Sequence, residues 1–236
     1  MENQLPPSWQ PHGLALKAYW KGDKKATIDI HMDDESITSM PIEIYFRTLE
    51  EFPEIEKIAL PLCKGKTLDV GAGAGAHCLA LQENGIDVTG LDISPDGAEI
   101  MKLRGVKKTI CQDFLKYYPT QAFDTLLFLM NGIGIAGNLH QLDEYLQHAQ
   151  SLTTAGGQII LDSSDLTFTE LELDFDQEYH GIFNYQLSFE GKIGSAYQWL
   201  YIDQEKLTEI AKRNNWLCEI IYEQEDGGYL ARLKKL

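Results

Sequence analysis

The hydrophobic positions of this chain have three kinds of spacing, each confined to one part of the sequence. Between residues 66 and 162, short apolar runs alternate with longer amphipathic ones, which predicts βαβ units and a parallel sheet. The expected strands are Thr67–Val70, Ile86–Leu91, Val106–Cys111, Phe123–Met130 and Gln158–Asp162. The helix expected before the fifth strand carries its leucines on one stripe, as a helix packed on a sheet does.

The N-terminal part, residues 1–63, lacks this alternation. Two helical stretches are expected in it, Leu14–Trp20 and Ile42–Leu60, and Pro53 interrupts the second. We therefore expect a helical N-terminal extension or cap, followed by a sheet domain that spans residues 64–236.

The C-terminal part alternates aromatic and polar residues. This pattern covers Phe183–Phe189 and Ile193–Tyr201, with Glu190-Gly191 between the two runs, and it predicts a β-hairpin inserted within residues 165–202.

One more helix is expected after Asp203, which is placed to cap it. The runs Trp216–Glu223 and Tyr229–Leu233 then follow, joined through Asp226-Gly227. This is a strong hairpin signal, so the last two strands are expected to be antiparallel.

The residues TLDVGAGAG at positions 67–75 are the most informative segment. A strand that turns sharply into a helix needs glycines for positive φ angles and for close approach of the backbone to a ligand. The helix that follows offers N–H groups and the positive end of its dipole to an anion, and Asp69 is placed to hold an ammonium group. Gly71, Gly73 and Ala76 also satisfy the GxGxxA pattern of nicotinamide and flavin sites, and a tight turn without a ligand is a further interpretation.

Two more acids follow expected strands. Asp92 ends the second strand, roughly twenty residues beyond the loop, where a carboxylate accepts hydrogen bonds from ribose hydroxyls. Its other interpretation is a cap for the helix that begins at Ser94-Pro95. Asp113 ends the third strand, where it can accept from an adenine amino group with Phe114 packed on the ring, or be a solvated turn residue.

The runs TLDVGAGAGAHCLAL, VTGLDISP, CQDF and FDTLLFLMNGIGI together resemble the class I methyltransferases that use S-adenosylmethionine. The motifs cover residues 66–162, and the order of elements agrees as far as the C-terminus. The resemblance implies an α/β fold, a Rossmann-like three-layer sandwich. Its sheet would be seven-stranded and mostly parallel, with the last strand inserted antiparallel between the fifth and the sixth.

The resemblance also implies which residues hold the cofactor. They are Asp69, Gly71, Ala72, Gly73 and Gly75 at the methionine portion, Asp92 at the ribose with Ile93 beside it, Asp113 and Phe114 at the adenine, and Met130 and Asn131 on the far side. It further implies that the additions to the common sheet, residues 1–63 and 165–202, choose the acceptor. We expect them to form a lid or wall at the carboxyl end of the strands, which would exclude water.

The acceptor and the catalytic base stay open. The sequence after the fourth strand lacks the Asn/Asp-Pro-Pro-aromatic signature of enzymes that methylate bases or glutamine amides, so those acceptors are disfavoured. Three histidines are candidates for a base: His77, which also suits packing or capping, and His140 and His180, which also suit the surface. Asn131 is a candidate for orienting the acceptor. Four aromatic residues are candidates for an acceptor pocket or for core packing, namely Tyr185, Tyr197, Trp199 and Tyr201.

Composition narrows the class of partner. The chain has 20 Lys and Arg against 36 Asp and Glu, a net charge of −16, which disfavours nucleic acid and favours a small-molecule acceptor. Alternatively, the negative charge only keeps the protein soluble and says nothing about its partner. Four scattered cysteines without a CxxC pair predict reduced thiols and no metal site. Without an apolar span or a signal-like N-terminus, a cytoplasmic protein with no membrane contact is expected. The oligomeric state is open.

Two other functions are compatible with parts of this pattern. A nicotinamide-dependent oxidoreductase would share the glycine loop and Asp92, but it accounts neither for Asp69 nor for the antiparallel final strands. A methyltransferase-like binding protein without activity is the second, because no catalytic base is identified.

Overall fold

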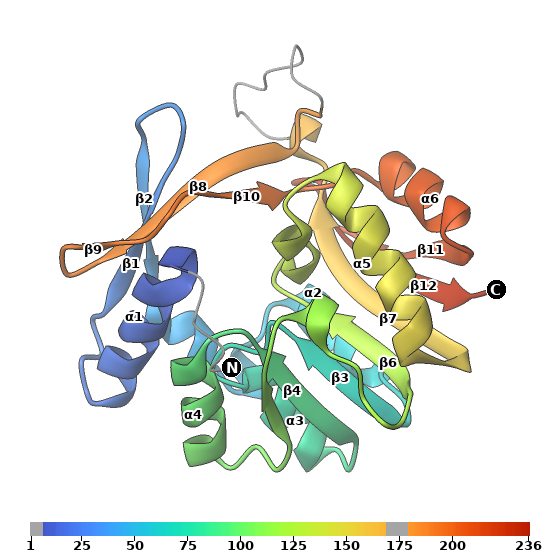
Figure 1. The fold of residues 1–236 in the computed structure, drawn as a ribbon, viewed down its shortest axis with the longest axis horizontal. Coiled ribbons are helices and arrows are strands. Elements are labelled where there is room, and N and C mark those ends of the chain that lie inside the picture. Colours follow the sequence, from blue (N-terminus) through green and yellow to red (C-terminus); the bar gives the residue numbers. More distant parts are fainter. Residues whose placement is uncertain (1–6, 169–178) are drawn as a thin grey trace. The chain divides into compact units, whose positions relative to one another are not determined.

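The computed structural model describes residues 7–168 and 179–236 (Figure 1). The chain forms two compact units. Of the described residues, the first comprises 7–52, 69–117 and 184–197, and the second comprises 53–68, 118–168, 179–183 and 198–236.

A seven-stranded sheet carries the predicted βαβ pattern. Its strands in chain order are β3 (Lys66–Val70), β4 (Asp87–Asp92), β5 (Thr109–Cys111), β6 (Phe123–Phe128), β7 (Thr153–Ser164), β11 (Trp216–Glu223) and β12 (Gly228–Lys235). The strand order across the sheet is β11-β12-β7-β6-β3-β4-β5. β4 pairs with β5 and β6 with β7 in parallel, whereas β12 is antiparallel to both β7 and β11. The last strand therefore lies between the fifth and sixth, which confirms the expected fold class.

The helices of the βαβ part begin and end where local chemistry predicts. They are α3 (Ala76–Glu83), α4 (Pro95–Arg104) and α5 (Leu139–Leu152), and α6 (Gln204–Arg213) follows later in the chain. The Ser94 side chain caps α4 by accepting from Gly97 N, and the Asp203 side chain caps α6 by accepting from Lys206 N. Gly105 ends α4 with a φ angle of 100°, which an L-residue rarely adopts.

The N-terminal extension is not wholly helical, so this part of the prediction is wrong. It begins with η1 (Pro7–Trp9) and α1 (Gln10–Trp20), but a β-hairpin of β1 (Thr27–His31) and β2 (Ile37–Pro41) follows. β1 pairs antiparallel with β8 (Ile182–Phe189), which turns into β9 (Lys192–Ile193), and β10 (Tyr197–Leu200) completes a second sheet (Figure 1). The partner of β1 is thus β8 of the inserted hairpin, and the local sequence around β1 does not predict this pairing.

The stretch expected as one broken helix over Ile42–Leu60 is a series of short turns. They are η2 (Ile42–Phe46), η3 (Leu49–Glu51), α2 (Glu54–Ala59) and η4 (Leu60–Leu62). Thr48 and Glu51 form a capping box that starts η3 anew, and Pro53 then forces an extended residue before α2.

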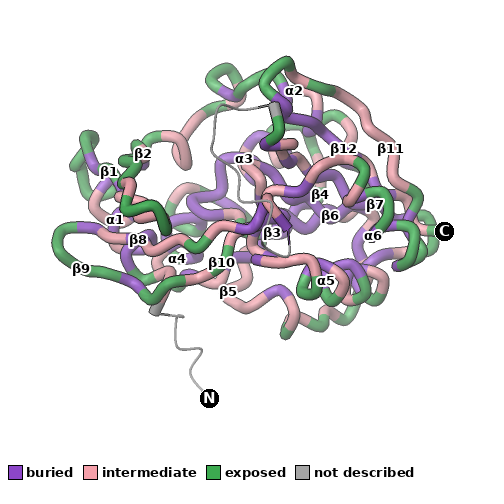
Figure 2. The backbone as a smooth tube through the Cα atoms, turned by 90° about the horizontal axis from the view of Figure 1, so that it is seen from above, coloured by how far each residue is buried: buried purple, intermediate pink, exposed green. Residues whose placement is uncertain are grey.

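Burial is greatest in the inner strands of the main sheet, whereas the edge strands β5 and β11 are mostly half-buried (Figure 2). In β3 the residues from Thr67 to Val70 are all buried, and so are the last four residues of β6. Buried polar side chains are few, and two of them, Asp69 and Asp92, lie at the ends of neighbouring strands. No helix in the described part of the chain is long and apolar enough to cross a membrane.

Candidate functional site

The loop between β3 and α3 turns through three glycines with positive φ angles, 74° at Gly71, 54° at Gly73 and 81° at Gly75. An L-residue adopts such angles only with strain, so the glycines permit the turn. Gly71 is exposed, and a Cβ atom placed on it would meet no atom within 4 Å. The backbone at Gly71 therefore faces open space that a ligand can enter.

Most of the loop amides already have partners within the protein. Gly71 N and Ala72 N both donate to the carbonyl oxygen of Leu91, at 2.9 and 3.1 Å. Gly75 N donates to the Ala72 carbonyl at 2.7 Å, and Gly73 N donates to Oδ2 of Asp92, also at 2.7 Å. This loop thus offers a ligand close approach of its backbone more than free N–H donors.

Asp92 is the acid that holds this loop. Its side chain is buried, and its second oxygen, Oδ1, accepts from Ser94 N at 2.7 Å. Burial raises the pKa of Asp92 to about 6, the two amide bonds oppose that shift, and the charge of Asp69 adds to it. Each carboxylate oxygen has a second lone pair, so Asp92 can accept two further hydrogen bonds. Ser94 and not Asp92 caps α4, and the hydrogen bond from Ser94 N to Asp92 leaves room for a ligand contact.

Asp69 lies within β3 and is also buried. Sγ of Cys78, in the first turns of α3, donates to Oδ2 of Asp69 at 3.2 Å. Burial and then the negative charge of Asp69 raise the pKa of the Cys78 thiol well above its usual range. Cys78 is thus a neutral donor to Asp69 and not a reactive thiolate.

The end of β5 carries the residues expected at the adenine. Asp113 is only half-buried, and its Oδ1 accepts from the backbone N–H two residues on at 3.0 Å. Its Oδ2 lies 3.4 Å from Nζ of Lys116. Such partners are typical of a turn residue, which is the alternative interpretation of Asp113 given above. Phe114 is buried, and Ile93, which follows Asp92, is half-buried.

Met130 and Asn131 follow β6 in the second unit and have φ angles of 61° and 51°. Asn131 N lies 3.0 and 3.1 Å from the two carboxylate oxygens of Asp162, and donates to them. Its Nδ2 donates to the Leu200 carbonyl at 3.1 Å, and its Oδ1 accepts from Oγ of Ser163 at 2.9 Å. The side chain of Asn131 is therefore committed to holding its own turn.

Residues of the N-terminal extension lie against the glycine loop, and no sequence motif marked them. The ring of Tyr45 comes within 3.3 Å of the point where a Cβ on Gly73 would lie. Arg104 of α4 fastens this contact, because its guanidinium donates to the carbonyls of Tyr45 at 3.2 Å, Phe46 at 3.1 Å and Ala74 at 2.7 Å. One side chain thus ties the extension and the loop together within the first unit.

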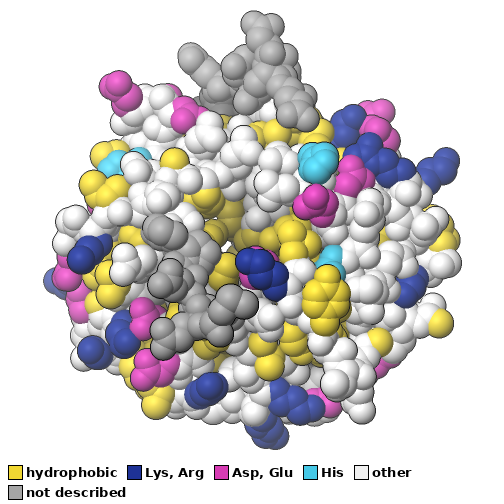
Figure 3. Space-filling view, in the orientation of Figure 1, with side chains coloured by type: hydrophobic (Ala, Val, Ile, Leu, Met, Phe, Trp, Pro, Cys, Tyr) yellow, Lys and Arg dark blue, Asp and Glu magenta, His cyan; other side chains and the backbone are white. Residues whose placement is uncertain are grey.

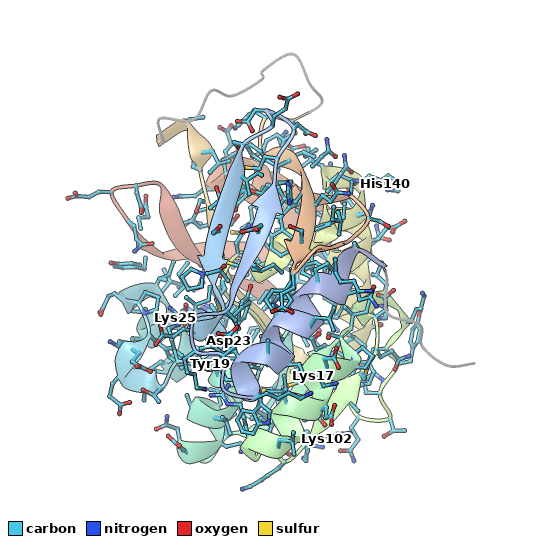
Figure 4. The ribbon with its side chains drawn as sticks, turned by 90° about the vertical axis from the view of Figure 1, so that its left-hand side faces the viewer. Lys17, Tyr19, Asp23, Lys25, Lys102 and His140 are labelled. Carbon is cyan, nitrogen blue, oxygen red and sulfur yellow. The ribbon has the colours of Figure 1, made fainter. Side chains whose placement is uncertain are left out.

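Helix α1 of the extension packs beside α4 (Figure 4). Nζ of Lys17 donates to Oδ1 of Asp96 at 2.7 Å. A Cβ on Gly13 would lie only 2.8 Å from Oγ of Ser94, so the two helices approach closely at this glycine. The extension therefore lies against Gly73 and Ser94, the two residues whose amides donate to Asp92.

The histidine candidates have different surroundings. His77 is buried, and its ring centroid is 5.0 Å from that of Phe52, as suits a packing residue. His140 is exposed (Figure 4), and the half-buried His180 has its ring 4.6 Å from Tyr179.

The four aromatic candidates divide between the two units. In the first unit, the rings of Tyr185 and Tyr197 are 6.3 Å apart at a steep angle, and Trp9 lies 4.9 Å from Tyr197. Trp199 and Tyr201 are half-buried residues of the second unit. The described part of the hairpin insertion thus brings Tyr197 against the N-terminal extension.

Charged side chains of both signs are interspersed on the face shown in Figure 3, where no single basic patch stands out. Within residues 7–168 and 179–236, no group of three His, Cys, Asp or Glu side chains is placed to hold a metal ion.

Comparisons with known proteins agree with this geometry. The sequence model of a family described as "Methyltransferase domain" matches residues 68–161. An S-adenosylmethionine-dependent methyltransferase from Bacteroides fragilis, solved in complex with S-adenosyl-L-homocysteine, is 36% identical. The match covers 98% of each chain with a TM-score of 0.90.

More distant structures share the fold alone. The CcbJ methyltransferase from Streptomyces caelestis is 14% identical over 79% of this chain and 94% of its own, with a TM-score of 0.62. CalS10, an amino pentose methyltransferase from Micromonospora echinaspora, is 15% identical over 77% and 87%, with a TM-score of 0.54. No curated protein sequence matches the chain.

Proposed function

Because the chain belongs to the class I S-adenosylmethionine-dependent methyltransferases, we propose that its glycine loop and neighbouring acids bind the adenosyl cofactor and that its methyl acceptor is a small molecule. The membership makes the chain an enzyme whose cofactor is S-adenosylmethionine. The nicotinamide-dependent oxidoreductase and the inactive binding protein considered above are accordingly set aside.

One observation carries the proposed cofactor site: open backbone at Gly71 lies beside a buried carboxylate, Asp92, that retains free lone pairs. An adenosyl group here would use the open space beside Gly71, into which a Cβ would project, and its ribose hydroxyls would donate to Asp92. The rest of the proposed set is Asp69, Ala72, Gly73, Gly75, Ile93, Asp113, Phe114, Met130 and Asn131.

Methyl transfer requires the protein mainly to position the cofactor and the acceptor. When bound, the cofactor supplies a methyl group already activated by a positive sulfur. The residues of this chain hold the two reactants in line and exclude water, and alignment of this kind supplies roughly 7–11 kcal/mol. A general base is needed only for an ordinary hydroxyl or a protonated amine as acceptor.

The acidic surface supports a small-molecule acceptor. With a net charge of −16, the chain repels phosphate backbones, and the face in Figure 3 offers no basic patch for them. We further propose that residues 1–63 and 165–202 form the acceptor-selecting cap on the domain of residues 64–236. Tyr45 against Gly73 and Tyr197 against Trp9 support this. A cytoplasmic location stays a prediction, supported by four cysteines that are all free thiols.

The cofactor site is tested by the affinity for S-adenosylhomocysteine, measured by calorimetry without any acceptor. Asp92→Ala should weaken binding by about 1–3 kcal/mol, roughly 5- to 150-fold, because hydrogen bonds to a charged group are lost. The matched control is Asp87→Ala, an exposed acid at the opposite end of the same strand, which should bind like the parent. Equal affinity in the two variants would remove Asp92 from the site.

The acceptor class is tested by product formation. With S-adenosylmethionine supplied, a low-molecular-weight cell extract should support release of S-adenosylhomocysteine. Turnover that depends only on the macromolecular fraction would contradict the proposed small-molecule acceptor.

A further inference from the structure

His12 is a buried histidine with an unsatisfied nitrogen. It lies in the first turn of α1, only 6% of its surface is exposed, and its Nε2 has no hydrogen-bond partner among residues 7–168 and 179–236. Buried polar atoms in folded proteins nearly always have partners, so an orphaned one calls for an explanation such as a missing ligand.

Aromatic rings surround the His12 imidazole. The Trp9 ring lies 5.9 Å away and the Tyr45 ring 4.7 Å away, both nearly perpendicular to the imidazole. These contacts bury the ring but offer its nitrogen no oxygen or nitrogen partner. Packing therefore explains the position of the ring and leaves Nε2 unexplained.

Two contacts place His12 beside the proposed ribose site. Its ring neighbour Tyr45 touches Gly73, the residue whose amide donates to Asp92. Burial and then the charge of Asp92 raise the pKa of Tyr45, so that carboxylate is close to Tyr45 as well. On the other side, Gly13 lies against Ser94, whose amide donates to the same carboxylate.

The charge state of His12 indicates what it binds. Burial lowers the pKa of His12 to about 4, so the imidazole is neutral at physiological pH. A neutral imidazole nitrogen donates or accepts according to its tautomer. A hydroxyl group, which can do either, matches it in both tautomers, whereas a carboxylate or an ammonium would match only one.

We propose that Nε2 of His12 forms a hydrogen bond with a ribose hydroxyl of the bound adenosyl ligand, opposite the carboxylate of Asp92. The N-terminal extension would then supply part of the cofactor site as well as covering it. This inference rests on the proposed function, because it takes the ribose to lie at Asp92.

The test measures binding of S-adenosylhomocysteine and of its 2′-deoxy and 3′-deoxy analogues by calorimetry. His12→Phe keeps an aromatic ring among Trp9 and Tyr45 but removes the nitrogen. The variant should bind S-adenosylhomocysteine about tenfold more weakly, as expected for one lost hydrogen bond. One of the two deoxy analogues should bind the variant and the parent equally, because it lacks the hydroxyl that His12 contacts.

Three controls keep the outcomes distinct. His31→Phe changes a histidine of the same unit whose Nε2 has a partner, Oγ of Ser188 at 2.8 Å, and should leave the affinity unchanged. His12→Gln restores a side-chain amide and should recover part of the loss. Thermal unfolding of the ligand-free His12→Phe variant should show no loss of stability, since an unpaired buried nitrogen is removed.

The proposal is overturned if His12→Phe binds S-adenosylhomocysteine as tightly as the parent, or if the loss is equal for all three ligands. Unchanged affinity together with a lower kcat/KM for an acceptor would assign His12 to the acceptor instead. If Asp92→Ala also leaves the affinity unchanged, the cofactor site itself is misplaced. If Asp92 matters and His12 does not, only this inference fails.

Discussion

Two turns that follow strands of the main sheet have left-handed backbone, but they are stabilised in different ways. The turn at Gly71–Gly75 follows β3, the turn at Met130-Asn131 follows β6, and both need left-handed backbone. In each, a backbone amide is held by the carboxylate of a residue from the adjacent strand. Gly73 N donates to Asp92 of β4, and Asn131 N donates to Asp162 of β7.

The difference lies in what is left for a ligand. The first turn uses glycines, its backbone is open at Gly71, and each carboxylate oxygen of Asp92 keeps a second lone pair. The second turn forces two residues with side chains into left-handed geometry and stabilises them through Ser163 and Leu200. We infer that the first turn contacts a ligand through its backbone, whereas the second holds Met130 and Asn131 in a rigid geometry.

The largest effect is expected at the second turn. Asn131→Asp removes the donor to the Leu200 carbonyl and sets a second carboxylate beside Asp162, so the free energy of unfolding should fall by about 3 kcal/mol or more. Urea denaturation measures the change. In Asn131→Gly the side-chain bonds are lost but the strain at φ 51° is relieved, so a smaller loss is expected. If both variants are as stable as the parent, Asn131 does not lock this turn.

The next largest effect concerns the pH dependence of the free energy of unfolding, to which two groups of the first unit contribute with opposite signs. The pKa of Asp92 rises from 3.8 to about 6 on folding, so the folded protein holds a proton that the unfolded chain has lost. Stability from this group therefore falls as pH rises from about 4 to 6. The pKa of His12 drops from 6.5 to about 4, so the unfolded chain holds the proton, and stability rises with pH over nearly the same window.

The two slopes, each at most about 1.4 kcal/mol per pH unit, largely cancel in the parent protein. Asp92→Asn should expose the rise due to His12, and His12→Gln should expose the fall due to Asp92. Urea unfolding in half-unit steps between about pH 4.5 and 6.5 measures both slopes. Slopes of the same sign in the two variants would contradict this account of the buried charges.

The smallest effect on stability is expected at Gly71. Gly71→Ala should cost about 1–2 kcal/mol of unfolding free energy, because alanine resists a φ angle of 74°. Gly85→Ala is a matched control, since Gly85 is also exposed, has a φ angle of 78° and would meet no atom within 4 Å. Both variants should lose similar stability, but only Gly71→Ala should lose affinity for S-adenosylhomocysteine. Equal affinities would mean that the space beside Gly71 is not used.

The sequence predicted the sheet because its signals are local. Gly85 and Gly105 end helices where left-handed residues are needed, and Asp226-Gly227 joins antiparallel strands. The hairpin of β1 and β2 was not predicted, because its strands are short and β1 pairs with residues 186–188, far along the chain. A single buried isoleucine, Ile28, shows little periodicity of its own.

Only part of the candidate site could be predicted from the sequence. Gly71 and Asp92 follow strands at a spacing that physical chemistry explains, so sequence alone pointed to them. His12 and Tyr45 carry no such spacing, because only tertiary packing shows that a histidine is buried and lacks a partner. The last turn of α4 has two basic residues, Lys102 and Arg104, and only the structure shows that Arg104 donates to the backbone of Tyr45 and Phe46.

The most direct test of the central claim is a crystal structure of this protein with S-adenosylhomocysteine bound. We expect ribose hydroxyls within about 3 Å of the Asp92 carboxylate and ligand atoms in van der Waals contact with the backbone at Gly71. Ligand density that lies away from Gly71, or a ribose that does not touch Asp92, would contradict it.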